Sequence, residues 1–312
     1  MARPLVTHPT AELMMRSQAV QGRSLLADAR RRLFRNKAAV ASMGLLSVIA
    51  LMAIFAPLVS VYAFDFGDYN AINCPPNWWP TELSRCAGAG AHVFGTDALG
   101  RDLFVRTLYG ARVSLAVGLT ATFVSLMIGV LYGAVAGFVG GRVDAVMMRT
   151  VDILYSLPFI FFVIILMVIF NQNFILLFVA IGAVSWLTMA RIVRGQTLSA
   201  KQKEFVEAAR AGGVSGFGII RRHIVPNVVG PVIVYVTLTI PGVILAESFL
   251  SFLGLGIRDP FTSWGVLISE GTQQMETAPW SLMFPASFMA LTLFCFNFIG
   301  DGLRDALDPK DR

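Results

Sequence analysis

Long apolar runs alternate with shorter polar segments along most of the chain. An α-helix needs about 20 apolar residues to cross a bilayer, and each run is close to or above that length. The period-2 alternation of a membrane β-barrel is absent, so the backbone must satisfy its hydrogen bonds within helices. The pattern predicts an all-α polytopic membrane protein with about six transmembrane helices. The runs lie near residues 38–63, 111–140, 151–170, 174–191, 228–253 and 281–300.

Three prolines, Pro158, Pro231 and Pro241, fall inside these runs. A proline removes one helical hydrogen bond, but neighbouring groups in a membrane bundle can satisfy the freed carbonyl. We therefore expect a kink, and no helix end, at each of the three positions.

The composition agrees with a membrane protein. Hydrophobic residues make up 56% of the 312 residues and charged residues 14%, whereas soluble domains carry about 25% charged residues. The first run follows 37 mostly polar residues and exceeds the ~7–15 apolar residues of a signal peptide. We expect no signal peptide.

Lysine and arginine gather in four polar segments, residues 1–37, 141–150, 191–226 and 302–312, which hold 20 of the 25 cationic residues. Cytoplasmic segments of membrane proteins carry such an excess. We therefore predict that both termini lie in the cytoplasm and that the loop 64–107 lies on the opposite side. The net charge of +6 follows from this topology, so we expect no nucleic-acid partner.

The stretch 24–36, before the first run, is amphipathic. Leucines recur at helical spacing on one side, and the basic residues lie mostly on the other. This pattern predicts an N-terminal interfacial helix that faces anionic lipid headgroups, with an ordinary solvated helix as the alternative. The basic residues are Arg30, Arg31, Arg32 and Arg35.

Four glycines of the second run, Gly129, Gly133, Gly137 and Gly141, recur at intervals of four residues. Positions without side chains at this spacing form one stripe on a helix, where another backbone can approach closely. The stripe predicts helix packing. The sequence leaves open whether the neighbouring helix belongs to this chain or to a second subunit.

Two of the three cysteines, Cys74 and Cys86, lie in the loop 64–107. If this loop faces an oxidising periplasm, a disulfide between them is the favoured prediction. A metal site that includes His92 is the alternative, but no fourth ligand or close-spaced pair accompanies it, so we expect no metal. Cys295, in the last run, is predicted to serve packing.

The stretch FGTDALGRDLFVR, residues 94–106, ends the same loop. Thr96, Asp97 and Asp102 can cap helix starts, while Gly95 and Gly100 permit tight turns. We favour a structural role for this stretch, and docking of an external partner is the alternative.

Ionisable residues within the runs are few, which argues against a proton-driven scheme. Asp152 follows Arg149 by three residues, a spacing that favours an ion pair on one helix surface. Glu247 lies deeper in its run. With Ser248 and Ser251 it either lines an aqueous translocation pathway or pairs with a neighbouring subunit.

The chain lacks the motifs of an enzyme. No Gly-x-x-x-x-Gly-Lys-Ser/Thr sequence is present to cradle phosphates, and no nucleophile–base or metal constellation stands out. We predict a protein without catalytic residues, without a nucleotide site and without a cofactor of its own.

A polar segment at 204–227, EFVEAARAGGVSGFGIIRRHIVPN, separates two long apolar runs. A helical pattern breaks at Gly212 and Gly213, after which Ser215 can cap a second short helix. Pro226 is suited to the first turn of the next span. The segment therefore predicts two short helices joined by a glycine elbow.

The predicted elbow carries more apolar residues than a solvated connector needs. Phe205 lies on the first short helix, and Phe217, Ile220 and Ile224 lie on the second. Apolar surface that is exposed on a rigid elbow usually marks a docking site. We favour docking over the alternative, a solvated connector.

These residues resemble the EAA loop of ABC-importer permeases. Glu207, Ala208 and Ala209 begin it, Gly213 follows Glu207 by six positions, and RHIVPN closes it. Three further stretches, FGTDALGRDL, ESFLSFLGLG and FCFNFIGDGLRDALDPKDR, resemble the C-type permease subunit of oligopeptide and dipeptide importers. The resemblance covers essentially residues 24–312 and implies a type I ABC importer permease fold.

The resemblance also implies an organisation of the chain and a set of coupling residues. The segments are a cytoplasmic region 1–37, a first transmembrane helix 38–63, a periplasmic loop 64–107, a permease core 108–301 with a coupling loop 195–227, and a cytoplasmic tail 302–312. The residues that couple to an ATPase are Phe205, Glu207, Ala208, Ala209, Gly213, Phe217, His223 and Pro226.

The implied partners are a homologous B-type permease subunit, two ATPases that bind ATP and Mg, and a periplasmic peptide-binding protein at a bacterial inner membrane. The implied substrates are oligopeptides or dipeptides, while related importers carry nickel, glutathione or murein peptides. The insert between Cys74 and Cys86, with Trp78 and Trp79, is longer than the family pattern. A self-contained channel or secondary transporter is the competing class, but it leaves the elbow unexplained.

Overall fold

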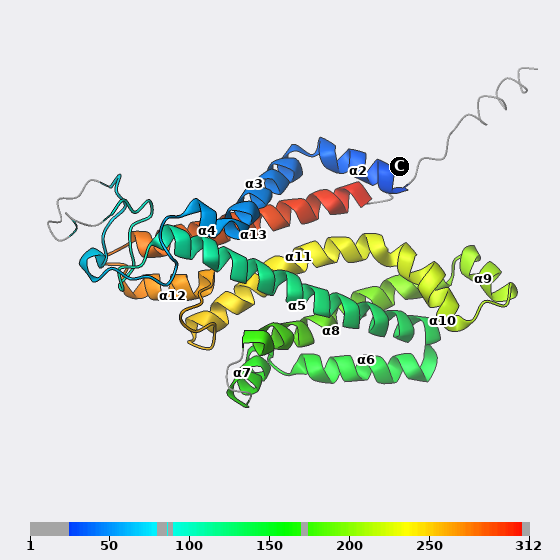
Figure 1. The fold of residues 1–312 in the computed structure, drawn as a ribbon. Helices are drawn as coiled ribbons and strands as arrows, with labels where there is room; N and C mark the ends of the chain where they lie inside the picture. The colour runs from blue at the N-terminus through cyan, green and yellow to red at the C-terminus, as the bar shows by residue number, and fades with distance from the viewer. Residues whose placement is uncertain (1–24, 80–85, 87–89, 170–173, 308–312) are drawn as a thin grey trace, which may run out of the picture.

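The computed structural model describes residues 25–79, 86, 90–169 and 174–307, and long helices dominate this part of the chain (Figure 1). Parts of the predicted N-terminal segment and C-terminal tail, residues 1–24 and 308–312, lie outside the described residues. The helices are α2 (Leu25–Arg35), α3 (Lys37–Ile54), α4 (Ala56–Val59), α5 (Leu103–Val139), α6 (Gly141–Ser156), α7 (Phe159–Ile169), α8 (Phe174–Lys201), α9 (Glu204–Ala211), α10 (Gly216–Ile219), α11 (Val225–Phe252), α12 (Trp264–Gln273) and α13 (Trp280–Leu307).

The predicted all-α membrane architecture is confirmed. Within the described residues, five helical stretches are long and apolar enough to cross a membrane, and they lie in α3, α5, α8, α10–α11 and α13. The sixth predicted span, 151–170, is divided between the last part of α6 and α7. These two helices form the return path between α5 and α8 (Figure 1).

The break between α6 and α7 corrects the expectation for Pro158. Leu157 has an extended backbone, with φ −75° and ψ 130°, because a proline ring disfavours the helical conformation of the residue before it. Pro231 and Pro241 lie inside the continuous helix α11, as expected. The first predicted span is also shorter than 38–63, since α3 ends at Ile54.

The two ends of the bundle differ in what they carry. Helices α9 and α10 project at one end, called here the α9 end, and α2 and the C-terminal end of α13 lie toward it (Figure 1). The opposite end, called here the disulfide end, carries α4, α12 and the irregular segment before α5. Both described chain ends therefore lie toward the α9 end.

The glycine stripe packs α5 against α8 of the same chain. A Cβ atom at Gly129, Gly133 or Gly137 would lie 2.4–3.1 Å from atoms of α8, including backbone atoms at each position. The neighbour left open by the sequence is thus internal. Gly141 is not part of the stripe, because it begins α6 with φ +58° and has open space where a Cβ would lie.

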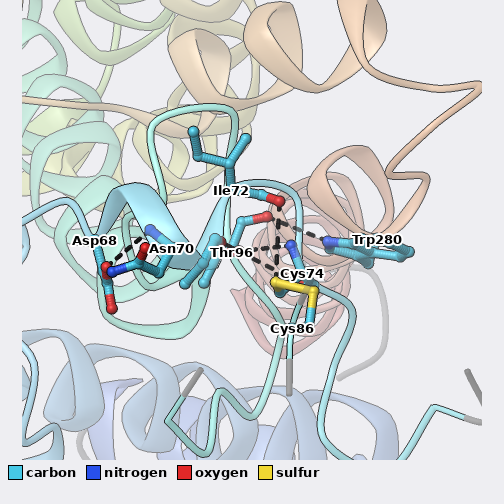
Figure 2. Close-up of a disulfide and its surroundings, with 8 residues drawn as sticks. Asp68, Asn70, Ile72, Cys74, Cys86, Thr96 and Trp280 are labelled. Atoms are coloured by element: carbon cyan, nitrogen blue, oxygen red, sulfur yellow. Dashed lines mark hydrogen bonds between the residues drawn. A yellow bond between two sulfur atoms is a disulfide. The ribbon is translucent and has the colours of Figure 1, made fainter. Parts of the chain in front are cut away.

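The disulfide end is closed by a covalent and hydrogen-bonded cap (Figure 2). Cys74 and Cys86 form a disulfide. The Cys74 N–H donates to Thr96 Oγ1 at 2.8 Å, and the Thr96 N–H donates to the Cys74 carbonyl at 2.9 Å. The Trp280 indole N–H donates to the Thr96 carbonyl at 3.2 Å. The cap is thereby attached to the start of α13.

The stretch 94–106 continues this cap into α5. Asp102 caps the helix, since its carboxylate accepts the Val105 N–H at 2.8 Å. Asp97 caps no helix. It accepts the Leu99 and Arg101 N–H groups in a turn at Gly100, which has φ +72°. Thr96 also caps no helix. Its hydroxyl makes a tertiary contact instead, since it donates to the Ala71 carbonyl.

His92 is paired away from the cysteines. Its Nδ1 lies 2.8 Å from Asp102 Oδ2, and both side chains are buried. Among the described residues, no group of three or more His, Cys, Asp or Glu side chains is positioned to hold a metal ion.

Candidate functional site

The predicted elbow is formed by α9 and α10 at the α9 end of the bundle. Gly212 ends α9, and Gly213 adopts φ +77°, a left-handed conformation that glycine accepts at little cost. The N–H groups of Gly212, Gly213 and Val214 donate to carbonyls of α9 at 2.9–3.1 Å. Ser215 then caps α10, since its hydroxyl accepts the Gly218 N–H at 3.2 Å. The turn is therefore held by hydrogen bonds within the elbow itself.

The inner face of the elbow is anchored in the bundle. Val206 of α9 and Ile219 of α10 are buried in one cluster with Met189 and Val193 of α8 and with Val228 of α11. Because side chains from all four helices share this cluster, a displacement of the elbow must also move the ends of α8 and α11.

Two residues assigned to the exposed second helix lie elsewhere. Ile220 and Ile224 belong to a π-helix, Ile220–Ile224, which joins α10 directly to α11. Both side chains are buried in the same cluster as Val206. The sequence pattern could not distinguish these anchoring isoleucines from docking residues, because both kinds of position are apolar. Pro226, as predicted, lies in the first turn of α11.

The outer face of the elbow exposes apolar and acidic side chains. Phe217 is 70% exposed and Phe205 38% exposed, and Glu207 and Ala208 are also exposed, with Ala209 half-buried. Within the part of the chain that the structure describes, no hydrogen bond or ion pair involves the Glu207 carboxylate. The elbow N–H groups bond to backbone carbonyls instead, so Glu207 faces outward without an internal partner.

His223 lies where the π-helix meets α11. Its side chain is half-buried, and its carbonyl accepts the Asn227 side-chain N–H at 2.6 Å. The neighbouring Arg221 and Arg222 are exposed. On the other side of the elbow, the Arg210 guanidinium lies 5.3 Å from the centre of the Phe138 ring, at the end of α5.

Glu247 lies inside the chain and not on an open surface. Its carboxylate is fully buried and accepts hydrogen bonds from Ser251 at 2.6 Å, Ser263 at 2.7 Å and Ser114 at 3.5 Å. The neighbouring Ser248 hydroxyl also donates to the Met289 sulfur, at 3.3 Å. The hydroxyls join α5, α11 and the start of α12, and the partners Ser114 and Ser263 could not be identified from sequence spacing.

Two further ion pairs join α6 to α8. Asp152 pairs with Arg191 at 2.8 Å and not with Arg149, as the helical spacing had suggested. Asp144 accepts two hydrogen bonds from Arg194, at 2.5 and 2.6 Å. Both arginines were expected in a polar loop, but α8 continues as a helix to Lys201.

A charge cluster that sequence analysis missed lies at the disulfide end. Arg101 contacts Asp97 at 2.7 Å and Asp259 at 2.9 Å, and the fully buried Arg106 contacts Glu270 at 3.3 Å. Burial raises the pKa of the Glu270 carboxyl, while the two arginines act in the opposite direction. The i, i+4 spacing of Asp97 and Arg101 was the available signal. The cluster connects the cap to α12 and to the loop before it.

A protein-family model described as the binding-protein-dependent transport system inner membrane component matches residues 129–312. This range covers the last part of α5, both short helices of the elbow and all later helices. The chain belongs to this permease family. A second model, the N-terminal transmembrane domain of oligopeptide transport permease C, matches residues 24–76.

The permease is similar over nearly its whole length to curated proteins. It is 56% identical over 293 residues, 94% of this chain and 91% of the relative, to the oligopeptide transport system permease protein OppC of Haemophilus influenzae. It is 56% identical over 303 residues, 97% of each chain, to OppC of Escherichia coli K12. It is 46% identical over 286 residues, 91% of this chain and 86% of the relative, to the dipeptide transport system permease protein DppC of Bacillus subtilis.

These matches confirm the predicted resemblance to C-type importer permeases. They also weigh against the competing class, because the family is defined as the membrane component of a larger transport system. The permease is thus a multi-pass membrane component of a binding-protein-dependent transporter.

Proposed function

We propose that this permease is the C-type membrane subunit of an ATP-driven importer for oligopeptides and that the α9–α10 elbow docks on a cytoplasmic ATPase. The observation that carries the proposal is the elbow itself. Its inner residues are buried among α8 and α11, while Phe217, Phe205 and the internally unpartnered Glu207 face outward. Exposed aromatic residues on a rigid support are suited to a partner's groove.

The substrate class is inferred from the relatives. Two relatives at 56% identity are named oligopeptide permeases, which favours oligopeptides over the nickel, glutathione and murein peptides of related importers. A dipeptide is the second candidate, because a dipeptide permease is 46% identical. The binding protein, and not this chain, would select among peptides.

The proposed complex contains a homologous B-type permease subunit, two ATPases and a peptide-binding protein. The ATPases would hold ATP and Mg and hydrolyse the nucleotide, so this chain needs no nucleotide site, catalytic residue or cofactor of its own. Nucleic acid has no part in the proposal.

The proposed orientation places the α9 end in the cytoplasm of a bacterium and the disulfide end in the periplasm. The α9 end exposes Lys203, Arg210, Arg221 and Arg222, in agreement with the cationic excess of cytoplasmic segments. The disulfide end contains a Cys74–Cys86 bond, and such bonds persist in an oxidising compartment. Both termini and the helix α2 would then lie on the cytoplasmic side.

Transport would follow from alternating access between two conformations. When the ATPases close on ATP, the elbow moves with the groove that holds it. Val206, Ile219 and Ile224 are buried in one cluster with residues of α8 and α11, so these helices would tilt with the elbow. The path then opens toward the binding protein, and hydrolysis returns it to the inward-open state. Glu207 would contribute a charge-assisted hydrogen bond to the ATPase.

Reconstitution in liposomes tests this function. The complete complex should accumulate oligopeptide only with ATP and binding protein, and omission of the ATPases should abolish uptake. Flux through this chain alone would instead establish a self-contained channel or secondary transporter. Purification with a tag on this chain should recover the partner subunits, and the ligands of the recovered binding protein identify the substrate.

Thiol labelling of intact cells tests the orientation. A membrane-impermeant maleimide polymer should modify Cys86 only after a reductant is added, because the thiol is bonded to Cys74 until the disulfide on the periplasmic side is reduced. Cys74 is itself buried, so Cys86 is the residue that reports on the orientation. Cys295 is buried and should stay unmodified, and the double variant Cys74→Ser/Cys86→Ser provides the control. Modification without reductant, or only after the cells are broken, would contradict the assignment.

A further inference from the structure

A cavity of about 350 Å³ opens between α6, α8 and α11. Hydroxyl groups from all three helices line it, among apolar side chains. The described residues that line it include no charged side chain. Gly242 is one of them, and nothing lies within 4 Å of the position that a Cβ would take there. The hydroxyl-bearing residues are Tyr155, Ser185, Thr188, Tyr235 and Thr239.

An ion pair stands at the rim of this cavity. The Arg191 guanidinium lies 4.3 Å from the centre of the Tyr155 ring and contacts Asp152 at 2.8 Å. Both side chains are accessible in this chain, at 37% and 60%. Arg191 lies ten residues before the end of α8 at Lys201, which corresponds to about 15 Å along a helix. Arg191 therefore lies within Phe178–Lys201, a stretch that is long and apolar enough to cross a membrane.

The accessible ion pair and the five hydroxyl-bearing residues argue against contact of this surface with lipid. Accessible ions and hydroxyls in the hydrocarbon region face water or another protein surface, because their exposure to lipid is costly. The outer side of α5 has the opposite character, since Leu119, Phe123 and Leu131 are 54–60% exposed there. The hydroxyl-bearing cavity with its ion pair thus differs in character from this exposed apolar surface of α5.

The hydroxyls of the cavity are arranged to bond with amides. Ser185 and Thr239 donate their protons to carbonyls of their own helices at 2.8 Å, so their oxygens remain free to accept N–H groups. The Tyr155 and Tyr235 hydroxyls have no hydrogen bond to any described residue and can donate to carbonyls. Peptide groups supply both an N–H and a carbonyl.

We infer that the residues of this cavity line the solute path as its wall on the side of this permease. There they bind the backbone amides of an extended peptide, and the Asp152–Arg191 pair sets the charge preference at the rim. The inference rests on the proposed importer function. The path is thereby assigned to α6, α8 and α11. The buried residues Glu247, Ser248 and Ser251 lie outside it, where hydrogen bonds to Glu247 connect α5, α11 and the start of α12.

Cysteine accessibility in the complete transporter tests the assignment of the wall. In a Cys295→Ala background, Ser185→Cys and Thr239→Cys should react with a small charged methanethiosulfonate in at least one nucleotide state. When the peptide-loaded binding protein is added at ten times its dissociation constant, bound peptide should cover the cysteines and slow this reaction about tenfold. The lipid-facing Phe123→Cys and the buried Ser251→Cys are matched controls and should not react.

The wall assignment is overturned if neither cavity cysteine reacts in any nucleotide state, or if peptide leaves their reaction rates unchanged. ATP-dependent uptake by the unlabelled variants distinguishes a wrong wall assignment from a wrong importer function. ATP-dependent uptake with unreactive cavity cysteines refutes only the wall. Absence of ATP-dependent uptake by the Cys295→Ala parent and the native complex refutes the function.

Charge variants test the rim pair. Arg191→Ala leaves Asp152 unpaired and should shift the ratio of uptake rates for lysine-containing against glutamate-containing peptides about tenfold toward lysine. Asp152→Asn should shift the ratio the other way, and the exchange Asp152→Arg/Arg191→Asp should restore it. Asp144→Asn, in the second ion pair of the same helices, is the control that leaves the ratio unchanged. Unchanged ratios in both single variants, or shifts in the same direction, would refute the role of the pair.

Discussion

Gly213→Asp is expected to abolish peptide uptake while the permease still accumulates in the membrane at the native level. Gly213 has φ +77°, and a non-glycine residue in this region costs roughly 1–2 kcal/mol. That cost is small beside the ~5–15 kcal/mol by which folded proteins are stable, and nothing lies within 4 Å of a Cβ at this position. The chain should therefore fold, but a carboxylate should protrude from the face that we propose to dock on the ATPase.

Uptake of radiolabelled peptide, with immunoblots of membranes, measures this effect, and ATP hydrolysis that no longer responds to peptide would show the uncoupling. Gly213→Asn has a similar backbone cost and no charge, so it separates strain from charge. Gly212→Ala is a matched control, because its Cβ would meet its nearest neighbours at an ordinary 3.4 Å. Native uptake by Gly213→Asp at native abundance would contradict docking at this elbow.

Gly133→Leu is expected to prevent stable packing of the bundle. A Cβ at this position would lie 2.4 Å from the Ala190 carbonyl oxygen and 2.9 Å from the Arg194 backbone nitrogen. Backbone atoms of a packed helix cannot move aside as a flexible side chain can, and overpacking costs about 1–3 kcal/mol or more per site. We expect the ratio of folded to unfolded protein to fall at least about tenfold, which corresponds to 1.4 kcal/mol.

The folded fraction can be measured by monodisperse elution in mild detergent and by resistance to proteolysis. Gly44→Leu is the matched control, because Gly44 lies in the membrane helix α3 with nothing within 4 Å of its Cβ position. This control should elute and transport normally. If Gly133→Leu also elutes as a folded protein and supports uptake, then the close α5–α8 contact is not required for the fold.

The elbow was largely predictable because its signals are local. Gly212 and Gly213 break a helix wherever they occur, Ser215 caps whatever helix follows it, and Pro226 fits a first turn. Exposure at Phe217 followed from a short helix that has only one side to bury. Burial of Ile220 and Ile224 was not predictable, because it depends on a π-helix that turns both residues toward α8 and α11.

The pairing of charged residues was the least predictable part. Helical spacing suggested Asp152 with Arg149, but the structure pairs Asp152 with Arg191, 39 residues away. Glu247 likewise bonds to Ser114 from a helix 133 residues earlier. Side-chain partners depend on which helices pack together and at what rotation, and neither quantity is written in a local pattern of residues.

The sequence by itself determined that this protein crosses a membrane as helices and where the elbow turns, and it predicted that the elbow and both chain ends share one end of the bundle. Run length, charge distribution and glycine conformation act on a chain locally, so they can be read without a fold. The tertiary structure alone decided which apolar residues anchor the elbow and that the buried Glu247 connects three helices by hydrogen bonds. It also decided that hydroxyls of α6, α8 and α11 converge on one cavity. These properties arise from contacts between distant segments, and only the packing of the helices sets them.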